Sequence, residues 1–234
     1  MAYIIINNLI PSSLYPLKAT YPMTPEYITI HNTANDATAI NEIAYMTRNT
    51  DAISYHVAID DKHVVQAIPF TRNGWHAGDG NGAGNRKSIG IEICYSKSGG
   101  TRYKAAEENA IEFIANLLQQ FGWNMDRVKW HGDWSGKNCP HRIMDEGRTL
   151  AVRNAIAKRL AELNTNKPIS PKEDVRMFNP SSTTLKAAFE QYLAEAVKEG
   201  VMTDKWLTDF KAGKLSLDDA LALKVIIDQR LKKG

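Results

Sequence analysis

The chain has 234 residues, of which 43% are hydrophobic and 24% charged, so it can bury the core of one or two domains. Its formal net charge is +3, without the concentrated basic face of a dedicated nucleic-acid binder, and we expect no nucleic-acid partner. Two cysteines cannot build a disulfide framework, so the fold does not depend on an oxidising compartment.

The N-terminal segment, MAYIIINNLIP, has no positively charged region, and its apolar run is too short for a signal peptide. No stretch approaches the roughly 18 uninterrupted apolar residues that a membrane-spanning helix requires. We therefore expect a protein that is made in the cytoplasm and does not insert into a membrane. If it acts outside the cell, another factor must release it.

The first clear element covers residues 27–31, YITIH, whose alternating β-branched side chains predict a strand ending at His31. Residues 35–49 then predict a helix, because apolar side chains recur at helical spacing. The face assigned to the core consists of Ile40, Ile43, Ala44 and Thr47.

A hairpin and a long loop follow this helix. Residues 54–60, SYHVAID, and 63–69, HVVQAIP, predict two strands joined by a short polar turn. The Gly- and Asn-rich segment 71–87 has no core pattern and predicts a long loop, which in a compact domain is usually functional. Residues 88–95, SIGIEICY, predict a further strand.

The next region is mainly helical. Residues 104–121 predict an amphipathic helix, because apolar residues recur at three- and four-residue steps and Gly122 provides a stop. Residues 127–134, RVKWHGDW, predict a short strand, and 147–163 predict a last helix. Because strands alternate with helices, residues 1–164 are expected to form one α/β domain with a mixed sheet.

The composition changes at residues 165–174, TNKPISPKED, which carry two prolines and no core pattern and are interpreted as a linker. Residues 175–234 are expected to form a separate helical module, beginning with a helix over 184–199. The apolar face of this helix consists of Leu185, Phe189, Tyr192, Ala196 and Val197.

Two more helices are predicted in this module. Thr203 is expected to cap a short helix that contains Trp206. Ser216 and Asp219 resemble a capping box, which predicts a final helix over 217–232.

The loop KWHGDWSGKNCPHR, residues 129–142, places Cys139 eight positions after His131. A thiolate and an imidazole are natural zinc ligands. His31 is the third candidate, because it ends a strand and sites in α/β domains are built at strand ends. Two histidines and one cysteine leave one coordination position open, as catalytic zinc sites do. We therefore predict one zinc ion on His31, His131 and Cys139.

Other interpretations of this loop remain open. Asp133 is a rival third ligand, because in a strand it would point the same way as His131. Cys139 could instead be a nucleophile paired with His131 or His141, although this leaves Glu92 without a role. In the interpretation that assigns no chemical role, His131 is an ordinary loop histidine and Cys139 is a small buried thiol.

Glu92 lies in the middle of a predicted strand, on the face that also carries Gly90 and Cys94. A carboxylate there is costly to bury unless it is paired or used, and the alternative is an edge strand with Glu92 in solvent. Near a zinc ion it could accept a proton from water and deliver it to a leaving amine. Cys94 is interpreted as a small buried hydrophobe.

Three further polar residues are candidates for the site. Lys137, two positions before Cys139, could stabilise a developing oxyanion. Tyr55 could reach a substrate with its hydroxyl, although tyrosines that only pack in a core are commoner. His76, in the Gly-rich loop, could contact a ligand.

The chain contains, in this order, the motifs ITIHNTA, SYHVAID, GWHAGDG, SIGIEICYS and KWHGDWSGKNCPHR. Together they resemble the zinc-dependent N-acetylmuramoyl-L-alanine amidases of the type-2 amidase family, which includes the peptidoglycan recognition proteins. The resemblance covers about residues 1–163 and is strongest with endolysins of phages and prophages of Bacillus. It implies a central mixed sheet flanked by helices, with the zinc in a surface groove.

The resemblance also implies roles for individual residues. The implied metal ligands are His31, His131 and Cys139. Glu92 matches the general base and acid, and Lys137 matches the lysine that shares the oxyanion charge. Tyr55 matches a tyrosine that some members use, and His76 matches a histidine that contacts substrate.

The implied reaction is hydrolysis, by a zinc-activated water, of the amide bond between N-acetylmuramic acid and L-alanine in bacterial peptidoglycan. We expect an endolysin that is made in the host cytoplasm, is released through a holin pore and lyses the host cell. The alternatives are a host autolysin and a zinc-bearing peptidoglycan-binding protein without catalysis. The module over 175–234 is expected to bind the cell wall or to mediate self-association.

Overall fold

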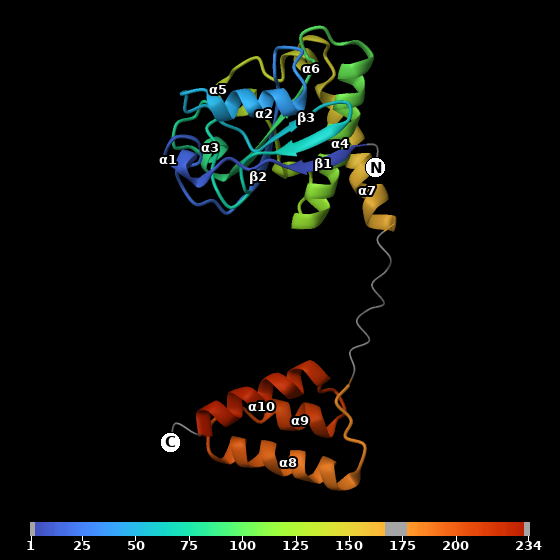
Figure 1. Ribbon diagram of the computed structural model, residues 1–234. Helices are drawn as coiled ribbons and strands as arrows, with labels where there is room; N and C mark the ends of the chain where they lie inside the picture. The colour runs from blue at the N-terminus through green and yellow to red at the C-terminus, as the bar shows by residue number, and fades with distance from the viewer. Residues whose placement is uncertain (1–2, 167–176, 232–234) are drawn as a thin grey trace. The chain divides into compact units, whose positions relative to one another are not determined.

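The computed structural model describes residues 3–166 and 177–231 of the chain (Figure 1). The chain divides into two compact units, Met1–Asn166, here called unit 1, and Lys167–Gly234, called unit 2. Of the predicted linker, residues 167–174 lie outside the described residues.

Unit 1 is built on a six-stranded sheet with the order β1-β4-β3-β5-β2-β6. The strands are β1 (Ile4–Asn7), β2 (Tyr27–Asn32), β3 (Val57–Ile59), β4 (His63–Gln66), β5 (Ser88–Ile93) and β6 (Val128–Trp130). Only β3 and β4, the predicted hairpin, pair antiparallel, and the other neighbours pair parallel, so the sheet is mixed as predicted. β5 lies inside the sheet, so the alternative that placed Glu92 on an edge strand is wrong.

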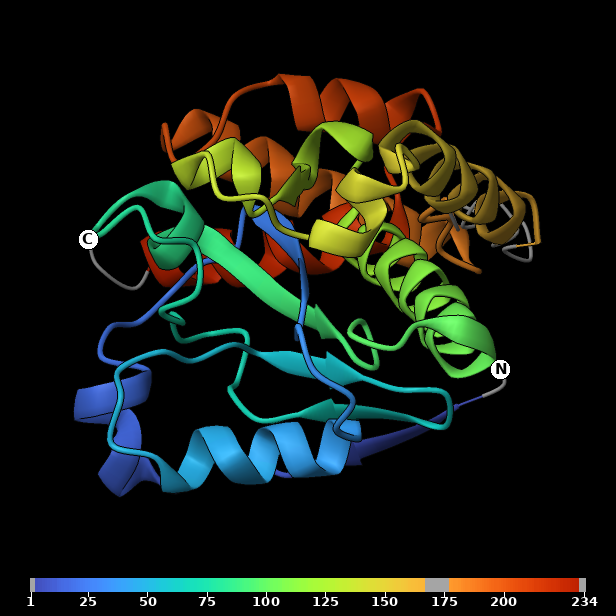
Figure 2. The same ribbon diagram turned by 90° about the horizontal axis from the view of Figure 1, so that it is seen from above.

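Helices cover both faces of this sheet, with α2 on one side and α4 and α7 on the other (Figure 2). The helices of unit 1 are α1 (Tyr15–Lys18), α2 (Ala39–Arg48), α3 (Ala83–Lys87), α4 (Gly100–Phe121), α5 (Gly132–Ser135), α6 (His141–Asp145) and α7 (Thr149–Asn166). β2 and β5 are almost entirely buried, as expected of central strands whose two faces both pack against helices. Their isoleucines join Ile114 and Leu118 of α4 in one core cluster.

The predicted inward face of α2 is partly wrong. Ile40 is 41% exposed, whereas the buried residues of the helix are Ala39, Glu42, Ile43 and Met46. Periodicity favours the stripe with most apolar residues, but the structure turns the carboxylate of Glu42 inward. Glu42 is accepted there because its Oε2 receives a hydrogen bond from the Tyr55 hydroxyl, at 3.2 Å.

The predicted loop over 71–87 contains more structure than its composition indicates. Its last part forms α3, and Asp79 supports that helix by accepting hydrogen bonds from the backbone N–H groups of Gly84 and Asn85, at 2.7 and 3.0 Å. A side chain thus satisfies the free donors at the start of α3. An apolar-pattern search does not detect a helix of this kind.

The helices after β5 begin and end differently from the prediction. α4 begins at Gly100, four residues before the predicted start of 104, and ends as predicted at Gly122, whose φ of 66° is left-handed. The last predicted helix, 147–163, is α7, which begins at Thr149 and continues to Asn166. α5 and α6 were not predicted.

Unit 2 contains α8 (Thr183–Lys198), α9 (Lys205–Lys211) and α10 (Leu217–Leu231) around a small core. The predicted face of α8 is wrong at Leu185, which is 57% exposed, while Leu193 is fully buried. The N-cap residue of α9 is Asp204 rather than Thr203, and its side chain makes no capping hydrogen bond. The capping box is confirmed, since the Asp219 N–H donates to Ser216 Oγ at 3.0 Å. Among the described residues, no helix is long and apolar enough to span a bilayer.

Candidate functional site

Two adjacent strands carry the first two residues of the site. β2 and β5 pair in a register that sets His31 directly opposite Glu92. In a parallel ladder, opposite residues point to the same face of the sheet. The pairing therefore holds an imidazole and a carboxylate side by side on a rigid support.

The segment after β6 brings two more residues to His31. His31 Nδ1 lies 3.0 Å from His131 Nδ1 and 3.8 Å from Cys139 Sγ. All three residues are buried, and one ligand atom from each lies within 4.8 Å of the other two. Two imidazole nitrogens and one sulfur, converging in this way, suit a zinc-type metal ion, so the predicted ligand set fits the donor chemistry of the site.

The electrostatics of the two histidines are compatible with metal binding. Burial lowers the pKa of His31 well below its usual value, and the neighbouring His76, His131 and Lys137 lower it further. Burial, followed by Lys137, also lowers the pKa of His131. Both rings are therefore neutral at neutral pH, which is the state that ligates a metal.

Cys139 does not have the electrostatics of a nucleophile. Burial, and then the charge of Glu92, raise the pKa of its thiol to about 11, against the smaller opposing effect of backbone hydrogen bonds from Asn32 and His141. Reactive catalytic cysteines lie in surroundings that lower the pKa of the thiol. The geometry therefore favours Cys139 as a ligand over Cys139 as a nucleophile.

Asp133 is not placed as a third ligand. The chain leaves the strand at Trp130 and enters α5, so Asp133 does not share a strand with His131. Its Oδ2 instead accepts a hydrogen bond from the Trp130 N–H at 2.8 Å. This carboxylate stabilises the turn that presents His131.

Glu92 supplies a carboxylate with spare hydrogen-bonding capacity. Its Oε2 is buried and has no hydrogen-bond partner among the described residues. Burial, and then the charge of Glu42, raise the pKa of Glu92 to about 8, while Lys137 acts in the opposite direction. A carboxyl group with a pKa near neutrality can both take up and release a proton at physiological pH.

The two remaining catalytic candidates differ in their surroundings. Lys137 is exposed, and its charge affects the pKa of Glu92, His31 and His131. The Tyr55 hydroxyl is buried and donates to the backbone and side-chain oxygens of Glu42, at 3.2 Å each. Burial raises the pKa of Tyr55, so its hydroxyl stays protonated.

His76 is buried against His31 rather than projecting into solvent. Its Nδ1 lies 3.1 Å from His31 Nε2, and its Nε2 lies 3.2 Å from the carbonyl oxygen of Ser88. The contact of His76 with substrate remains a prediction. In the structure its two ring nitrogens contact protein groups, His31 and the Ser88 backbone.

The seven predicted site residues line one cavity of about 460 Å³. Sequence reasoning missed several others that share it, namely Asn32, Ala52, Ile53, Trp75, Gly78, Asn85 and Ser135. It also missed Glu42, which shares a smaller neighbouring cavity with Tyr55 and Glu92. The position of Asn32, directly after His31, was an available signal, whereas nothing local distinguishes Glu42 from a solvated helix residue.

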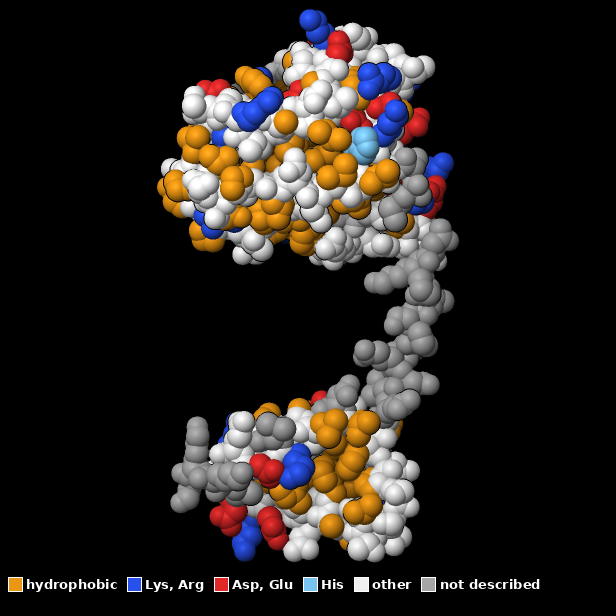
Figure 3. All heavy atoms as spheres, in the orientation of Figure 1, with side chains coloured by type: hydrophobic (Ala, Val, Ile, Leu, Met, Phe, Trp, Pro, Cys, Tyr) orange, Lys and Arg blue, Asp and Glu red, His pale blue; other side chains and the backbone are white. Residues whose placement is uncertain are grey.

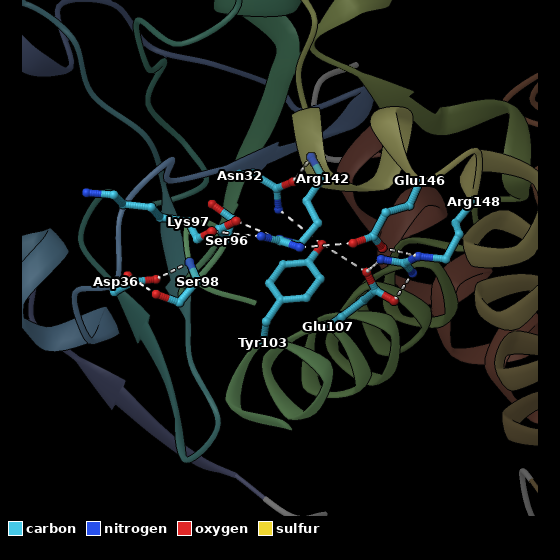
Figure 4. A network of polar contacts seen from close by, with 10 residues as sticks. All are labelled: Asn32, Asp36, Ser96, Lys97, Ser98, Tyr103, Glu107, Arg142, Glu146 and Arg148. Carbon is cyan, nitrogen blue, oxygen red and sulfur yellow. Dashed lines mark hydrogen bonds and ion pairs between the residues drawn. The ribbon is translucent and has the colours of Figure 1, made fainter. Parts of the chain in front are cut away.

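A polar network around Arg142 fixes the segment after Cys139 to the end of β2 and to the segment that follows β5 (Figure 4). The Arg142 N–H donates to Asn32 Oδ1 at 3.1 Å, and Asn32 Nδ2 lies 3.4 Å from the Tyr103 hydroxyl. The Arg142 guanidinium donates to the carbonyl oxygens of Ser96 and Lys97, at 2.6 and 2.7 Å. Arg142 thus connects the segment that carries two ligand candidates to the strand that carries the third.

This network continues along one face of α4 to the start of α7. Arg142 pairs with Glu146 at 2.9 Å, Arg148 pairs with both Glu146 and Glu107, and Glu107 accepts from the Tyr103 hydroxyl. A chain of alternating charges of this kind is more rigid than an isolated surface ion pair.

Comparison with known proteins relates this site to one family. The family model described as N-acetylmuramoyl-L-alanine amidase matches residues 21–142. The chain is 56% identical to N-acetylmuramoyl-L-alanine amidase CwlA of Bacillus subtilis over 187 residues, which cover 80% of this chain and 68% of the relative. It is 60% identical to N-acetylmuramoyl-L-alanine amidase XlyB of the same organism over 155 residues, which cover 66% of this chain and 49% of that relative.

Solved structures show the same fold. The structure of PlyL superposes with a TM-score of 0.65 and 49% sequence identity, and the match covers 67% of this chain and 98% of that one. The matched part of the chain thus spans about half to two thirds of the length of the two Bacillus relatives, and nearly all of the PlyL structure.

Proposed function

The chain belongs to the family of N-acetylmuramoyl-L-alanine amidases, and on that premise we propose that it hydrolyses the amide bond between N-acetylmuramic acid and L-alanine in bacterial peptidoglycan. The observation that carries the proposal is the convergence of His31, His131 and Cys139 in one cavity with the unpaired carboxylate of Glu92. Ligands without such a carboxylate would suit a structural or binding role equally well.

His31, His131 and Cys139 are the residues that would hold a single zinc ion. When bound, such an ion would polarise the substrate carbonyl and would lower the pKa of a bound water toward roughly 7. Three protein ligands, rather than four, are typical of zinc sites that act in catalysis.

Glu92 is the proton carrier of the proposed reaction. It takes up the proton of the attacking water at its free Oε2, because no other described residue occupies that atom. It then returns the proton to the nitrogen of L-alanine.

Lys137 and Tyr55 have supporting roles in this proposal. Lys137 places an exposed ammonium at the rim of the cavity, where it can share the negative charge that develops on the carbonyl oxygen. The Tyr55 hydroxyl is already bonded to Glu42, so its proposed effect is exerted through the environment of Glu92.

The proposed biological role is that of a bacteriolytic endolysin that reaches the wall after release through a holin pore. A host autolysin would carry out the same reaction. A zinc-bearing recognition protein without catalysis would not require Glu92, and the buried position of that carboxylate beside the ligands favours the enzyme.

The test is a product assay on purified Gram-positive peptidoglycan with and without a zinc chelator. We expect new alanine amino termini without new reducing sugar ends, lost on chelation and restored by zinc. Glu92→Gln should bind zinc but release alanine termini far more slowly than wild type. Wall binding by wild-type protein without bond cleavage would refute the amidase proposal and support a recognition function.

For unit 2 we propose cell-wall binding, with self-association as the alternative. Hydrophobic side chains lie exposed on the surfaces of both units (Figure 3), and in unit 2 they include the lining of a hollow of about 440 Å³ with Phe178, Phe189 and Tyr192. Aromatic rings can stack on sugar faces. We expect the full chain to pellet with peptidoglycan and a variant that ends at Asn166 not to pellet. The full chain should also remain monomeric in solution.

A further inference from the structure

His76 stands between a metal-ligand candidate and the backbone. Its ring lies 3.1 Å from His31 Nε2 on one side and 3.2 Å from the Ser88 carbonyl oxygen on the other. Both ring nitrogens of His76 are therefore occupied inside the protein, and the residue is only 7% exposed. A histidine whose role was to contact substrate would keep one nitrogen free.

The hydrogen bonds have a required direction. A carbonyl oxygen can only accept, so His76 Nε2 must carry the hydrogen, and in a neutral ring Nδ1 is then an acceptor. The hydrogen between the two rings must therefore belong to His31 Nε2. This leaves His31 Nδ1 without a hydrogen, with its lone pair on the side where His131 and Cys139 converge.

The backbone around His76 is shaped to hold the ring. A Cβ added at Gly90 would lie 2.7 Å from His76 Cδ2, and one added at Gly74 would lie 3.0 Å from the same atom. The Asn85 side-chain oxygen accepts hydrogen bonds from the N–H groups of His76 and Ala77, at 2.7 Å each. Two glycines thus leave room for the ring, and one buried asparagine fixes the backbone that carries it.

The other histidine ligand candidate is oriented by the same loop without an intermediary. The backbone of Ala77, the residue after His76, acts on the His131 ring as a hydrogen-bond partner that raises its pKa. His31 lies on β2, whose nearby backbone groups already pair with β5. Its Nε2 therefore contacts the side chain of His76, which in turn contacts the carbonyl oxygen of Ser88. The two neighbouring residues of one loop therefore serve the two imidazoles.

We propose that His76 is a positioning residue, which fixes His31 in the Nε2–H tautomer and so presents Nδ1 to the metal. The proposal rests on the metal site of the proposed function, but the tautomer itself can be measured without a metal. Partners of this kind fix the ring and the tautomer of a ligating histidine, and their loss typically costs about 10- to 100-fold in metal affinity.

The first test is the tautomer of His31 in the metal-free full chain, read from the ring ¹⁵N chemical shifts and two-bond ¹H–¹⁵N correlations. We expect hydrogen at Nε2 and a bare nitrogen at Nδ1 in the wild type. In His76→Leu, which has no acceptor, the Nδ1–H tautomer of His31 should become populated. Hydrogen at Nδ1 of His31 in the wild-type protein would overturn the proposal.

The second test is zinc affinity, measured by competition with a chromogenic chelator. His76→Leu should bind zinc about 10- to 100-fold more weakly than wild type, and His76→Asn, whose Oδ1 can accept in place of Nδ1, should recover most of the loss. Gly90→Ala, which leaves every ligand intact but displaces the His76 ring, should also weaken binding. His63→Asn, a partly exposed histidine on β4, is the control and should bind as wild type.

The outcomes separate this proposal from the proposed function. If the wild type binds no zinc, the metal site fails, and the tautomer measurement still decides the role of His76. If the wild type binds zinc and His76→Leu binds it equally well, the positioning role fails and the metal site stands. If His76→Asn is as weak as His76→Leu while both remain folded by circular dichroism, the acceptor is not what matters and the proposal is overturned.

Discussion

The site has two halves that are held in place by different means. His31 and Glu92 lie opposite each other on β2 and β5, where backbone hydrogen bonds on both sides of each strand fix their positions. His131, Lys137 and Cys139 lie on the segment after β6, which is not part of the sheet. Apart from one backbone hydrogen bond, from the His131 N–H to the Ile30 carbonyl oxygen at 3.3 Å, that segment is held by Arg142, Asn32 and Asp133 through side-chain hydrogen bonds.

The difference indicates where the site is sensitive to distant change. A strand in the middle of a sheet moves only if its neighbours move, so mutations elsewhere should leave the strand half intact. The loop half depends on a few side chains, and the loss of one should displace a ligand without unfolding unit 1. Substitutions in the two halves should therefore have separable effects.

Glu92→Gln removes the proton carrier of the strand half and keeps its shape. We expect the rate of alanine-terminus release to fall by about 10²- to 10⁴-fold, because an amide cannot take up the proton of water. Zinc affinity should change little, since Glu92 is not a ligand candidate. Retention of a tenth or more of wild-type activity would show that another residue carries the proton.

Lys137→Met tests the loop half at an exposed position. Removal of one group that stabilises an oxyanion costs about 10²-fold in kcat, and we expect a loss of that order with thermal stability unchanged. Lys62→Met, at an exposed lysine in the β3–β4 turn, is the matched control and should retain full activity. Equal activity of the two variants would remove Lys137 from the mechanism.

Glu92→Gln also tests the strand half through stability. Burial raises the Glu92 pKa from 4.5 to about 8, so between these values the folded chain binds more protons than the unfolded chain. The contribution of Glu92 to the free energy of unfolding is therefore fully present below pH 4.5 and is lost as the pH rises through 8. The glutamine side chain of the variant has no charge to bury at any pH.

In the metal-free protein, the stability of Glu92→Gln relative to wild type should therefore increase by about 4 kcal/mol between roughly pH 5 and pH 8.5. Urea unfolding with a chelator present measures the difference at each pH. A difference that is the same at both pH values would mean that the carboxylate is not desolvated as the structure indicates.

Arg142→Leu should affect the loop half alone. Its guanidinium connects the Cys139 segment to the carbonyl oxygens of Ser96 and Lys97, and its loss should lower zinc affinity by about tenfold. Arg148→Leu removes ion pairs of the same network but no contact with these two carbonyl oxygens, and this variant should bind zinc as wild type does. Equal losses in both variants would mean that general destabilisation, rather than the connection, sets the affinity.

Local patterns were enough for much of the fold and for choosing the candidate residues of the site. Alternation predicted β2 and β5, a polar turn predicted the β3–β4 hairpin, and Gly122 predicted the end of α4. Residue chemistry pointed to His31, His131 and Cys139, because few roles combine imidazole and thiol at a strand end. A carboxylate inside an isoleucine-rich strand likewise singled out Glu92.

The sequence by itself determined which side chains could do the chemistry, since ligand type and proton affinity belong to the residue. Tertiary structure decided which of them meet: the register that sets His31 opposite Glu92, the burial of Glu42 in place of Ile40, and the hydrogen bonds that His76 makes to His31 and Ser88. These depend on partners up to 100 positions away in the chain, as between His31 and His131. Periodicity and propensity describe only near neighbours, so they cannot specify such contacts.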